Sequence, residues 1–246
     1  MRYGLMLVMA GVLAYGLFML LGWPAARWLE YTPHLQAEQI SGDLRHGEAR
    51  RLRINNNAPL ERVSWQWRPA HVLRGRLTWQ LMLSDQGQHL TGSVSLTGRR
   101  HLLVNALQGQ LPLTTLAELA GRPLPFLTGQ LLADMPVVRL NAVGLWQEIE
   151  GIVQLVDGQL PSGAPLGTLQ AQFHTQGEMI TAELRDTGGS MILDATLILN
   201  VDGRYQLRGE LGTRANADPS LQQTLSLLGQ PAPGGRRQFN LSGSVR

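Results

Sequence analysis

The chain has 246 residues, of which 43% are hydrophobic and 16% charged, and this excludes long disordered stretches and two large domains. The 21 basic residues, all arginine, are scattered and give a net charge of only +3, so the concentrated basic face of a nucleic-acid-binding protein is missing. The absence of cysteine excludes disulfides and thiolate metal sites and fits an oxidising compartment.

The N-terminal segment predicts a membrane anchor. Residues 3–22 are uncharged and apolar on every side, and about 20 such residues span roughly 30 Å of hydrocarbon as a helix. A cleaved signal peptide is the alternative, but its apolar stretch is about 7–15 residues long and residues 24–26 make a poor cleavage site. Aromatic and basic residues typical of a membrane interface follow, namely Trp23, Arg27, Trp28 and Tyr31.

These observations divide the chain into three predicted regions. Residues 1–22 form a short cytoplasmic stub and the transmembrane anchor, residues 23–37 an interfacial linker, and residues 38–246 a β-rich domain. No second apolar run is long enough to cross a bilayer, so everything after the anchor lies on one side of the membrane. The domain is expected outside the cytoplasm, in a single-pass protein.

The body of the chain predicts antiparallel strands, because apolar and polar residues alternate between Gly, Asn and Asp turns. In residues 63–68 and 77–83 the side chains of Trp65, Trp67 and Trp79 fall on the apolar face. Hairpin turns are expected at residues 202–203 and, on weaker patterns, at 85–87 and 157–158. Further strands are expected at residues 39–44, 49–55, 90–96, 102–107, 129–140, 149–159, 169–174, 179–185, 191–201, 205–211 and 238–245.

Two short helices interrupt the strands. Residues 113–120 carry apolar side chains at helical spacing, and Gly121 follows them. Asp218 and Pro219 open the second helix, in which Leu221, Leu225 and Leu228 form an apolar stripe expected to pack on the core.

The predicted fold is mainly β: a strongly curved antiparallel sheet, open like a half-barrel or groove, with two short helices, preceded by one transmembrane helix. Glycines that follow Ser or Thr inside strands (Gly42, Gly92, Gly129 and Gly243) favour curvature, although such pairs are also common at strand edges. Ile192 and Ile198 sit on the second face of their strand, which predicts cover on both sides. The candidate apolar core or groove comprises Trp65, Trp67, Trp79, Ile192 and Ile198.

No motif for catalysis or metal binding stands out. The six histidines lack ligand spacing, and nucleophile elbows, phosphate loops and calcium loops are absent. Asp186-Thr-Gly188 has the form of an aspartic protease motif, but it has no second copy and its neighbours predict a turn. We therefore expect no enzyme, no metal and no cofactor.

The order of several segments resembles the protein N family of the bacterial type II secretion system, GspN. The resemblance is carried by residues 40–49 (Ile-Ser-Gly-Asp-Leu through Gly-Glu-Ala), 65–69 (Trp-Gln-Trp-Arg-Pro), 73–77, 202–205 and 217–229. It implies an inner-membrane protein of Gram-negative bacteria with a periplasmic domain, an accessory component of the machine that exports folded proteins across the outer membrane. It supplies no catalytic residues.

Two functions follow as hypotheses. The first is an accessory subunit of the secretion system that contacts its other components through the periplasmic domain. The alternative is a membrane-tethered module that binds or transfers lipid in a β-groove. Expected partners are other secretion components, membrane lipid and, as a possibility, a second copy of the chain; nucleic acid is not expected.

Overall fold

The computed structural model describes residues 24–25, 35–54, 60–97, 101–119, 127–215, 217–226 and 229–244. The predicted anchor at residues 3–22 and the interfacial residues Trp23, Arg27, Trp28 and Tyr31 lie outside these ranges. Among the described residues, no helix is long and apolar enough to cross a membrane.

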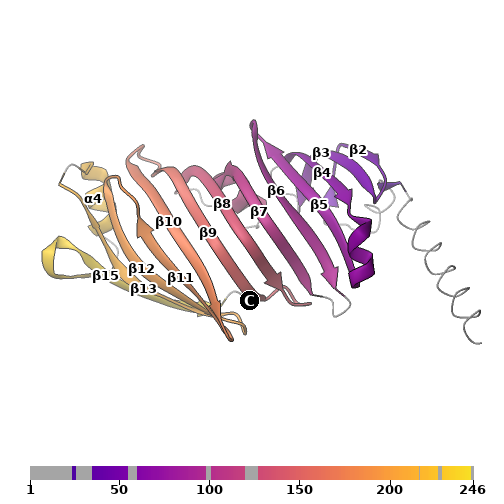
Figure 1. The fold of residues 1–246 in the computed structure, drawn as a ribbon. Coiled ribbons are helices and arrows are strands. Elements are labelled where there is room, and N and C mark those ends of the chain that lie inside the picture. Colours follow the sequence, from indigo (N-terminus) through magenta and orange to yellow (C-terminus); the bar gives the residue numbers. More distant parts are fainter. Residues whose placement is uncertain are drawn as a thin grey trace, which may run out of the picture.

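The described residues form one antiparallel sheet of 15 strands with a few short helices (Figure 1). The strands are β1 (Leu35–Gln36), β2 (Gln39–Gly42), β3 (His46–Ile54), β4 (Leu60–Trp67), β5 (Arg76–Asp85), β6 (Gln88–Thr97), β7 (Leu102–Pro112), β8 (Thr128–Leu140), β9 (Trp146–Gln159), β10 (Pro165–Gln176), β11 (Met179–Asp186), β12 (Met191–Asn200), β13 (Arg204–Thr213), β14 (Gln230–Pro231) and β15 (Arg237–Ser244). The helices are α3 (Leu113–Leu119), α4 (Pro219–Ser226) and the 3-10 turns η1 (Pro69–Arg74) and η2 (Pro233–Gly235). The prediction of a mainly β, antiparallel fold with two short α-helices is confirmed.

The topology is a meander in which neighbours in sequence are neighbours in the sheet. Each strand from β3 to β13 pairs antiparallel with the next, and β13 then pairs with β15. At one end β1 and β2 both pair with β3, and at the other β14 pairs with the start of β15. This order follows from the short connections between strands, which favour hairpins over crossovers.

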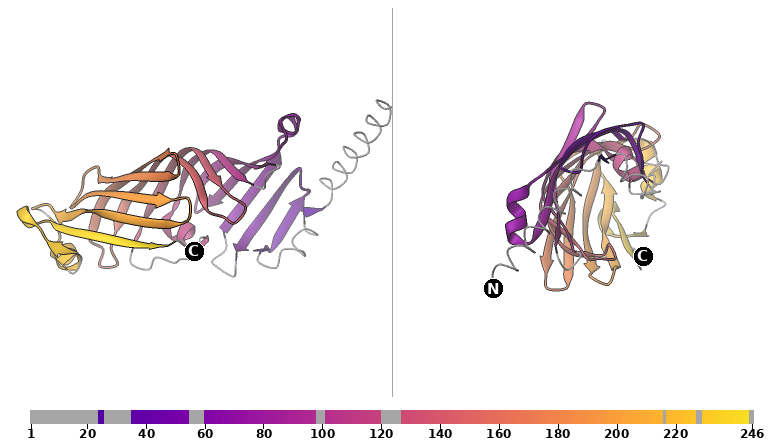
Figure 2. Two further views of the ribbon diagram at one scale, coloured as in Figure 1. Left: turned by 90° about the horizontal axis from the view of Figure 1, so that it is seen from below. Right: turned by 90° about the vertical axis from the view of Figure 1, so that its right-hand side faces the viewer.

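The sheet is one twisted layer whose first and last strands lie at opposite ends of the molecule (Figure 2). It is not strongly curled, so the prediction of a strongly curved half-barrel is wrong. The strand glycines serve local purposes instead. Gly129 has a φ of 145° at a register shift between β8 and β9. A Cβ on Gly243 would lie 2.7 Å from the Tyr205 hydroxyl, so this glycine makes room for a ring. Such positions absorb bulges and close contacts without rolling the sheet.

Two of the three predicted hairpin turns are confirmed. Gly203 has a φ of 89° between β12 and β13, and Gln86 and Gly87 have φ values of 50° and 78° between β5 and β6. The turn at Asp157 and Gly158 is wrong, because these residues lie within β9. Asp157 has a φ of 53° there, where the pairing with β10 shifts register.

The buried residues form two clusters. In the first, Leu221 and Leu225 of α4 pack with residues of β10, β12 and β13, which confirms the core role predicted for these two leucines. Leu228, the third residue of the predicted stripe, lies outside the described residues. The second contains Met135, Val138, Ile149, Ile180 and Leu199, with partly buried neighbours on β7 to β10 and β13. Every residue of the second cluster lies on a strand, so sheet side chains bury one another there without a helix.

Candidate functional site

One face of the sheet is apolar from end to end. Residues that pair directly across antiparallel strands project to the same face. Following these pairs from β2 to β13 and on to β15 traces a line of side chains without a single hydrogen-bonding or charged group. We call it the apolar row: Ile40, Ala49, Val63, Leu83, Leu90, Gly109, Ala133, Val153, Ala171, Leu184, Ala195, Gly209 and Phe239.

The opposite face carries a line of mostly polar residues across the same strands. We call it the polar row: Ser41, Glu48, Ser64, Met82, Thr91, Gln108, Asp134, Ile152, Gln172, Glu183, Thr196, Arg208 and Asn240. Ion pairs stand on this face, for example between Arg50 and Glu48 at 2.6 Å. The two rows define an apolar and a polar side of a single layer, as binary alternation dictates.

The apolar face has helices over only part of its length. Leu221 and Leu225 of α4 pack against Met191 and Leu211, which project from the same face as the apolar row. Near β5, Thr115 of α3 donates a hydrogen bond to the Asp85 carboxylate. Elsewhere, Leu96 on β6 and Leu241 on β15 remain 45% and 56% exposed. Ala49, Leu90 and Ala195 of the row are themselves buried, so this face offers a partner separate exposed apolar side chains such as these two leucines.

The three tryptophans of the predicted core or groove come together on the apolar face. Trp67 pairs directly with Trp79, and Trp65 lies on the same side of β4. The indole N–H groups of Trp65 and Trp79 donate to the carbonyls of Asp43 and Leu44, each at 2.8 Å. These bonds hold the turn between β2 and β3 against the apolar face, while all three indoles stay partly exposed.

Ile192 and Ile198 do not join the tryptophans. Ile198 pairs with Thr181 and Gln206, on the side of the polar row, and Ile192 pairs with Gly212. Both side chains are half-buried. The five residues grouped from the sequence therefore lie on two faces, and the cover predicted for the second face of β12 is not provided by a second layer among the described residues.

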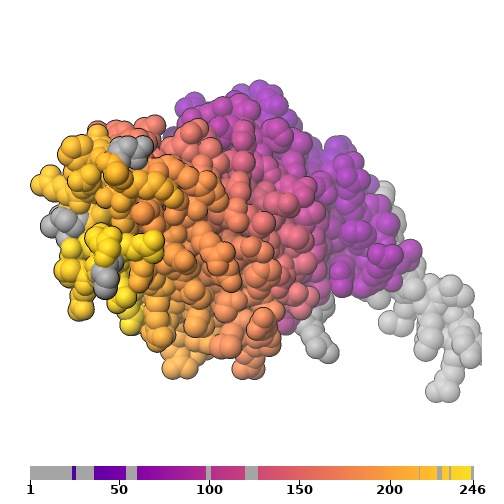
Figure 3. All heavy atoms as spheres, turned by 60° about the vertical axis from the view of Figure 1, so that its left-hand side comes forward, coloured from indigo at the N-terminus to yellow at the C-terminus, as the bar shows by residue number. Residues whose placement is uncertain are grey.

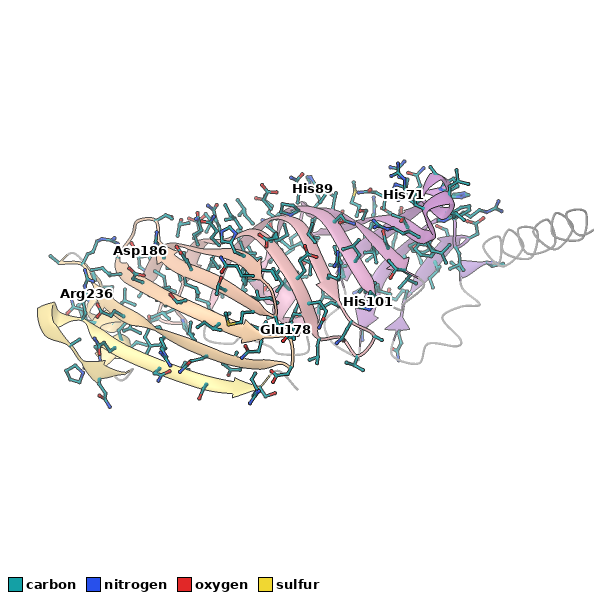
Figure 4. The ribbon with its side chains drawn as sticks, turned by 60° about the horizontal axis from the view of Figure 1, so that its bottom comes forward. His71, His89, His101, Glu178, Asp186 and Arg236 are labelled. Atoms are coloured by element: carbon teal, nitrogen blue, oxygen red, sulfur yellow. The ribbon has the colours of Figure 1, made fainter. Side chains whose placement is uncertain are left out.

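Asp43 stabilises the turn between β2 and β3 at one end of the sheet. Burial raises the pKa of Asp43, but hydrogen bonds from the backbone N–H groups of His46 and Arg45, together with their charges, outweigh it and leave this pKa below its usual value. The titratable residues labelled in Figure 4 lie at separate places along the molecule. Among the described residues, no group of three or more histidine, aspartate or glutamate side chains could hold a metal ion.

Comparison with known protein families gives a match over most of the chain. Residues 33–240 match the family described as type II secretion system (T2SS), protein N. The chain belongs to this family. Membership of the protein N family implies a role in protein secretion by that system. The match covers nearly the whole of the β-rich domain predicted for this chain. No curated protein and no solved structure matches the chain.

The sequence identified the three tryptophans of the apolar face but did not reveal the apolar row of this protein N. Its signal was available in principle, because each strand alternates, yet the row emerges only once the register between strands is fixed. Small residues such as Gly109, Ala133 and Gly209 contribute to it, and none of them stands out as apolar in a single strand.

Proposed function

We propose that this chain is an accessory, non-catalytic inner-membrane subunit of the type II secretion system, acting in protein export through contacts of its periplasmic domain. In this proposal residues 1–22 form the stub and anchor, 23–37 the interfacial linker, and 38–246 the periplasmic β-rich domain. The membership of the protein N family, over residues 33–240, carries the proposal. Other components of the secretion system are the expected partners.

The apolar face supports a role in protein contacts. A sheet that is apolar on one side normally buries that side against a second layer. Among the described residues, α3 and α4 cover only part of the apolar face, while Leu96 and the tryptophans stay partly accessible. A partner that covers this surface would supply the missing layer and gain about 25 cal/mol for each Å² of apolar area buried.

Site-specific photo-crosslinking in intact cells tests this function. A photoreactive residue replaces Leu96 on the apolar face or Met82 on the polar row, and the two positions are 45% and 44% exposed. We expect adducts with other secretion components from position 96 and few from position 82. Co-purification of the full chain after gentle extraction provides a second readout. Isolation without any secretion component, together with an absence of protein adducts, would contradict the proposal.

Binding of lipid acyl chains is a second candidate, favoured by the chemistry of the apolar row. Protein interfaces carry about one hydrogen bond per 100–200 Å², whereas hydrocarbon needs none. The row offers no hydrogen-bonding side chain and extends roughly 55 Å at about 4.8 Å per strand. The same probe at Leu96 separates the two functions, because mass spectrometry of the adducts shows either a protein or a phospholipid. Position 82 again serves as the control.

A further inference from the structure

The last strand of the sheet has one side without a partner along most of its length. β14 covers only Arg237 and Gln238 of β15, through Pro231 and Gln230. From Phe239 to Ser244, β13 is the one neighbour that β15 has among the described residues. This end of the molecule is drawn in yellow in Figure 3. The free side therefore presents backbone N–H and C=O groups that only another extended chain can satisfy in full.

Beyond the two residues that β14 covers, this edge lacks the features by which proteins normally block strand addition. Edge strands are usually very short, charged, interrupted by proline or bent by a bulge. Residues 238–244 contain neither a charged residue nor a proline. Their pairing with β13 runs without a register shift from Ser244 opposite Arg204 to Arg237 opposite Leu211. From Phe239 to Ser244 the strand is thus regularly paired with β13, uncharged and open on its other side among the described residues.

The opposite edge of the sheet is protected by short strands, nearby charges and an irregularity. It is formed by β1 and β2, which have only 2 and 4 residues. The neighbouring strand β3 carries three arginines, Arg50, Arg51 and Arg53. Arg51 has a φ of 50°, which makes the strand irregular at that residue. Pairing of β15 with this edge of another molecule would be a head-to-tail contact, which gives a ring or an open filament of many copies. Pairing of β15 with itself closes after two chains.

We infer that β15 is a dimerisation strand: two copies of the chain pair β15 to β15, antiparallel, about a two-fold axis at Leu241. In this register residues 239–243 of the two copies pair: Leu241 faces Leu241, Phe239 faces Gly243 and Asn240 faces Ser242. The pairing ends before Gln238, which β14 already covers. No like charges meet, which makes the strand self-complementary. Leu241, now 56% exposed, becomes buried. The inference is independent of the proposed function and rests on the edge alone.

The pairing has a consequence for the apolar face. A two-fold axis perpendicular to the sheet leaves corresponding faces on the same side. Phe239 belongs to the apolar row, and Leu241 and Gly243 share its face. The apolar rows of the two copies therefore join into one surface across the dimer. Any partner of that surface meets a two-fold symmetric site.

Cysteine crosslinking tests this register directly, because the chain has no cysteine of its own. Leu241→Cys places two thiols opposite each other at the axis, where paired Cα atoms lie about 4.5–5.5 Å apart, within disulfide range. In membranes containing the full chain, mild oxidation should give a disulfide-linked dimer. Met179→Cys, at a position 46% exposed on β11, is the control and should stay monomeric. Equal crosslinking at both positions, or none at position 241, would overturn the register.

A charge variant gives an independent readout. The double substitution Asn240→Lys and Ser242→Lys places lysines opposite each other in the dimer, and Thr196→Lys adds a charge on the same face of β12. Native mass spectrometry of the detergent-solubilised full chain should show a dimer for the wild type and for Thr196→Lys, and its loss for the double variant. A monomeric wild type, or a dimer that survives the double substitution, would overturn the proposal.

Discussion

Asp186 ties the end of β11 to β12 and to the segment after β13. Its side chain is only 8% exposed, accepts a hydrogen bond from the Leu193 N–H at 2.9 Å and forms an ion pair with Arg214. Arg214 also donates to the carbonyls of Gly189 and Met191, each at 2.8 Å. This network secures the turn of the Asp186-Thr-Gly188 motif, and the motif has a structural explanation.

The ionisation of Asp186 predicts a pH-dependent stability. Burial raises the pKa of Asp186, but the hydrogen bonds from Leu193 and Arg214 and the charge of Arg214 outweigh it, so this pKa lies below its usual value. The stabilisation is complete above the unfolded pKa of about 3.9 and is lost as the pH falls through the lower folded pKa. Asp186→Asn should lower the free energy of unfolding at pH 7 by about 1–2 kcal/mol, allowing for the exposure of Arg214.

Urea unfolding at pH 7 and pH 3 measures this effect. The wild type should lose more stability than Asp186→Asn between the two pH values. Glu183→Gln is the matched control, because Glu183 and its partner Arg185 are 56% and 63% exposed, and exposed pairs contribute little. Equal pH dependence of wild type and Asp186→Asn would show that the carboxylate is not stabilised by the fold.

At the scale of single residues, the sequence predicts the face of the sheet on which a side chain lies better than it predicts the contacts of that side chain. Alternation alone placed Trp65, Trp67 and Trp79 on one side of the sheet, and the pairing of Trp67 with Trp79 agrees. Alternation could not show that two of the indoles bind the carbonyls of Asp43 and Leu44, because these bonds depend on how the β2–β3 turn folds over its neighbours. Ile192 and Ile198 were grouped with the tryptophans because they are apolar. Alternation, which puts them on the second face of β12, predicted their position better.

At the scale of elements, α4 depends on the sheet for its stability. With 8 residues it is too short to persist alone in water, since isolated helices need about 12–15 residues. Leu221, which is 0% exposed, anchors it against the sheet. Leu221→Ala should therefore cost about 2–5 kcal/mol of folding free energy.

A thermal unfolding experiment on the full chain tests the role of α4. Leu73→Ala is the control, because Leu73 is 93% exposed on η1 and the chemical change is identical. We expect a marked fall in melting temperature for Leu221→Ala and little change for Leu73→Ala. If both variants melted like the wild type, α4 would contribute nothing to the stability of the sheet.

Most strands were predictable, but their irregularities were not. Period-two alternation located the strands from β2 to β13 and β15, usually within a few residues of their ends. Asp157-Gly158 shows the limit, because the sequence of a tight turn also suits a bulge, and only the continued pairing with β8 and β10 distinguishes the two. The same ambiguity led from the strand glycines to the prediction of a strongly curved sheet, whereas the sheet is not strongly curled.

At the scale of the whole molecule, the sheet behaves as a linear array. Each strand from β4 to β12 pairs only with the strands before and after it, and the ends of the described sheet do not pair with each other. Stability in such an array is a sum of terms between neighbours, as in repeat proteins. The degree of curl could not be read from the sequence, because alternation fixes which face is apolar but not how the twist accumulates along the array.

A linear array predicts that unfolding begins at the ends. Amide hydrogens in the central strands β8 and β9, with 13 and 14 residues and partners on both sides, should exchange more slowly than those of β2. Hydrogen exchange followed by mass spectrometry of the solubilised full chain measures this gradient. In the dimer, residues 239–244 should be protected, and the Asn240→Lys, Ser242→Lys variant should lose that protection while β2 is unchanged. Uniform protection of all strands would mean that the sheet opens as one cooperative unit, contrary to the linear description.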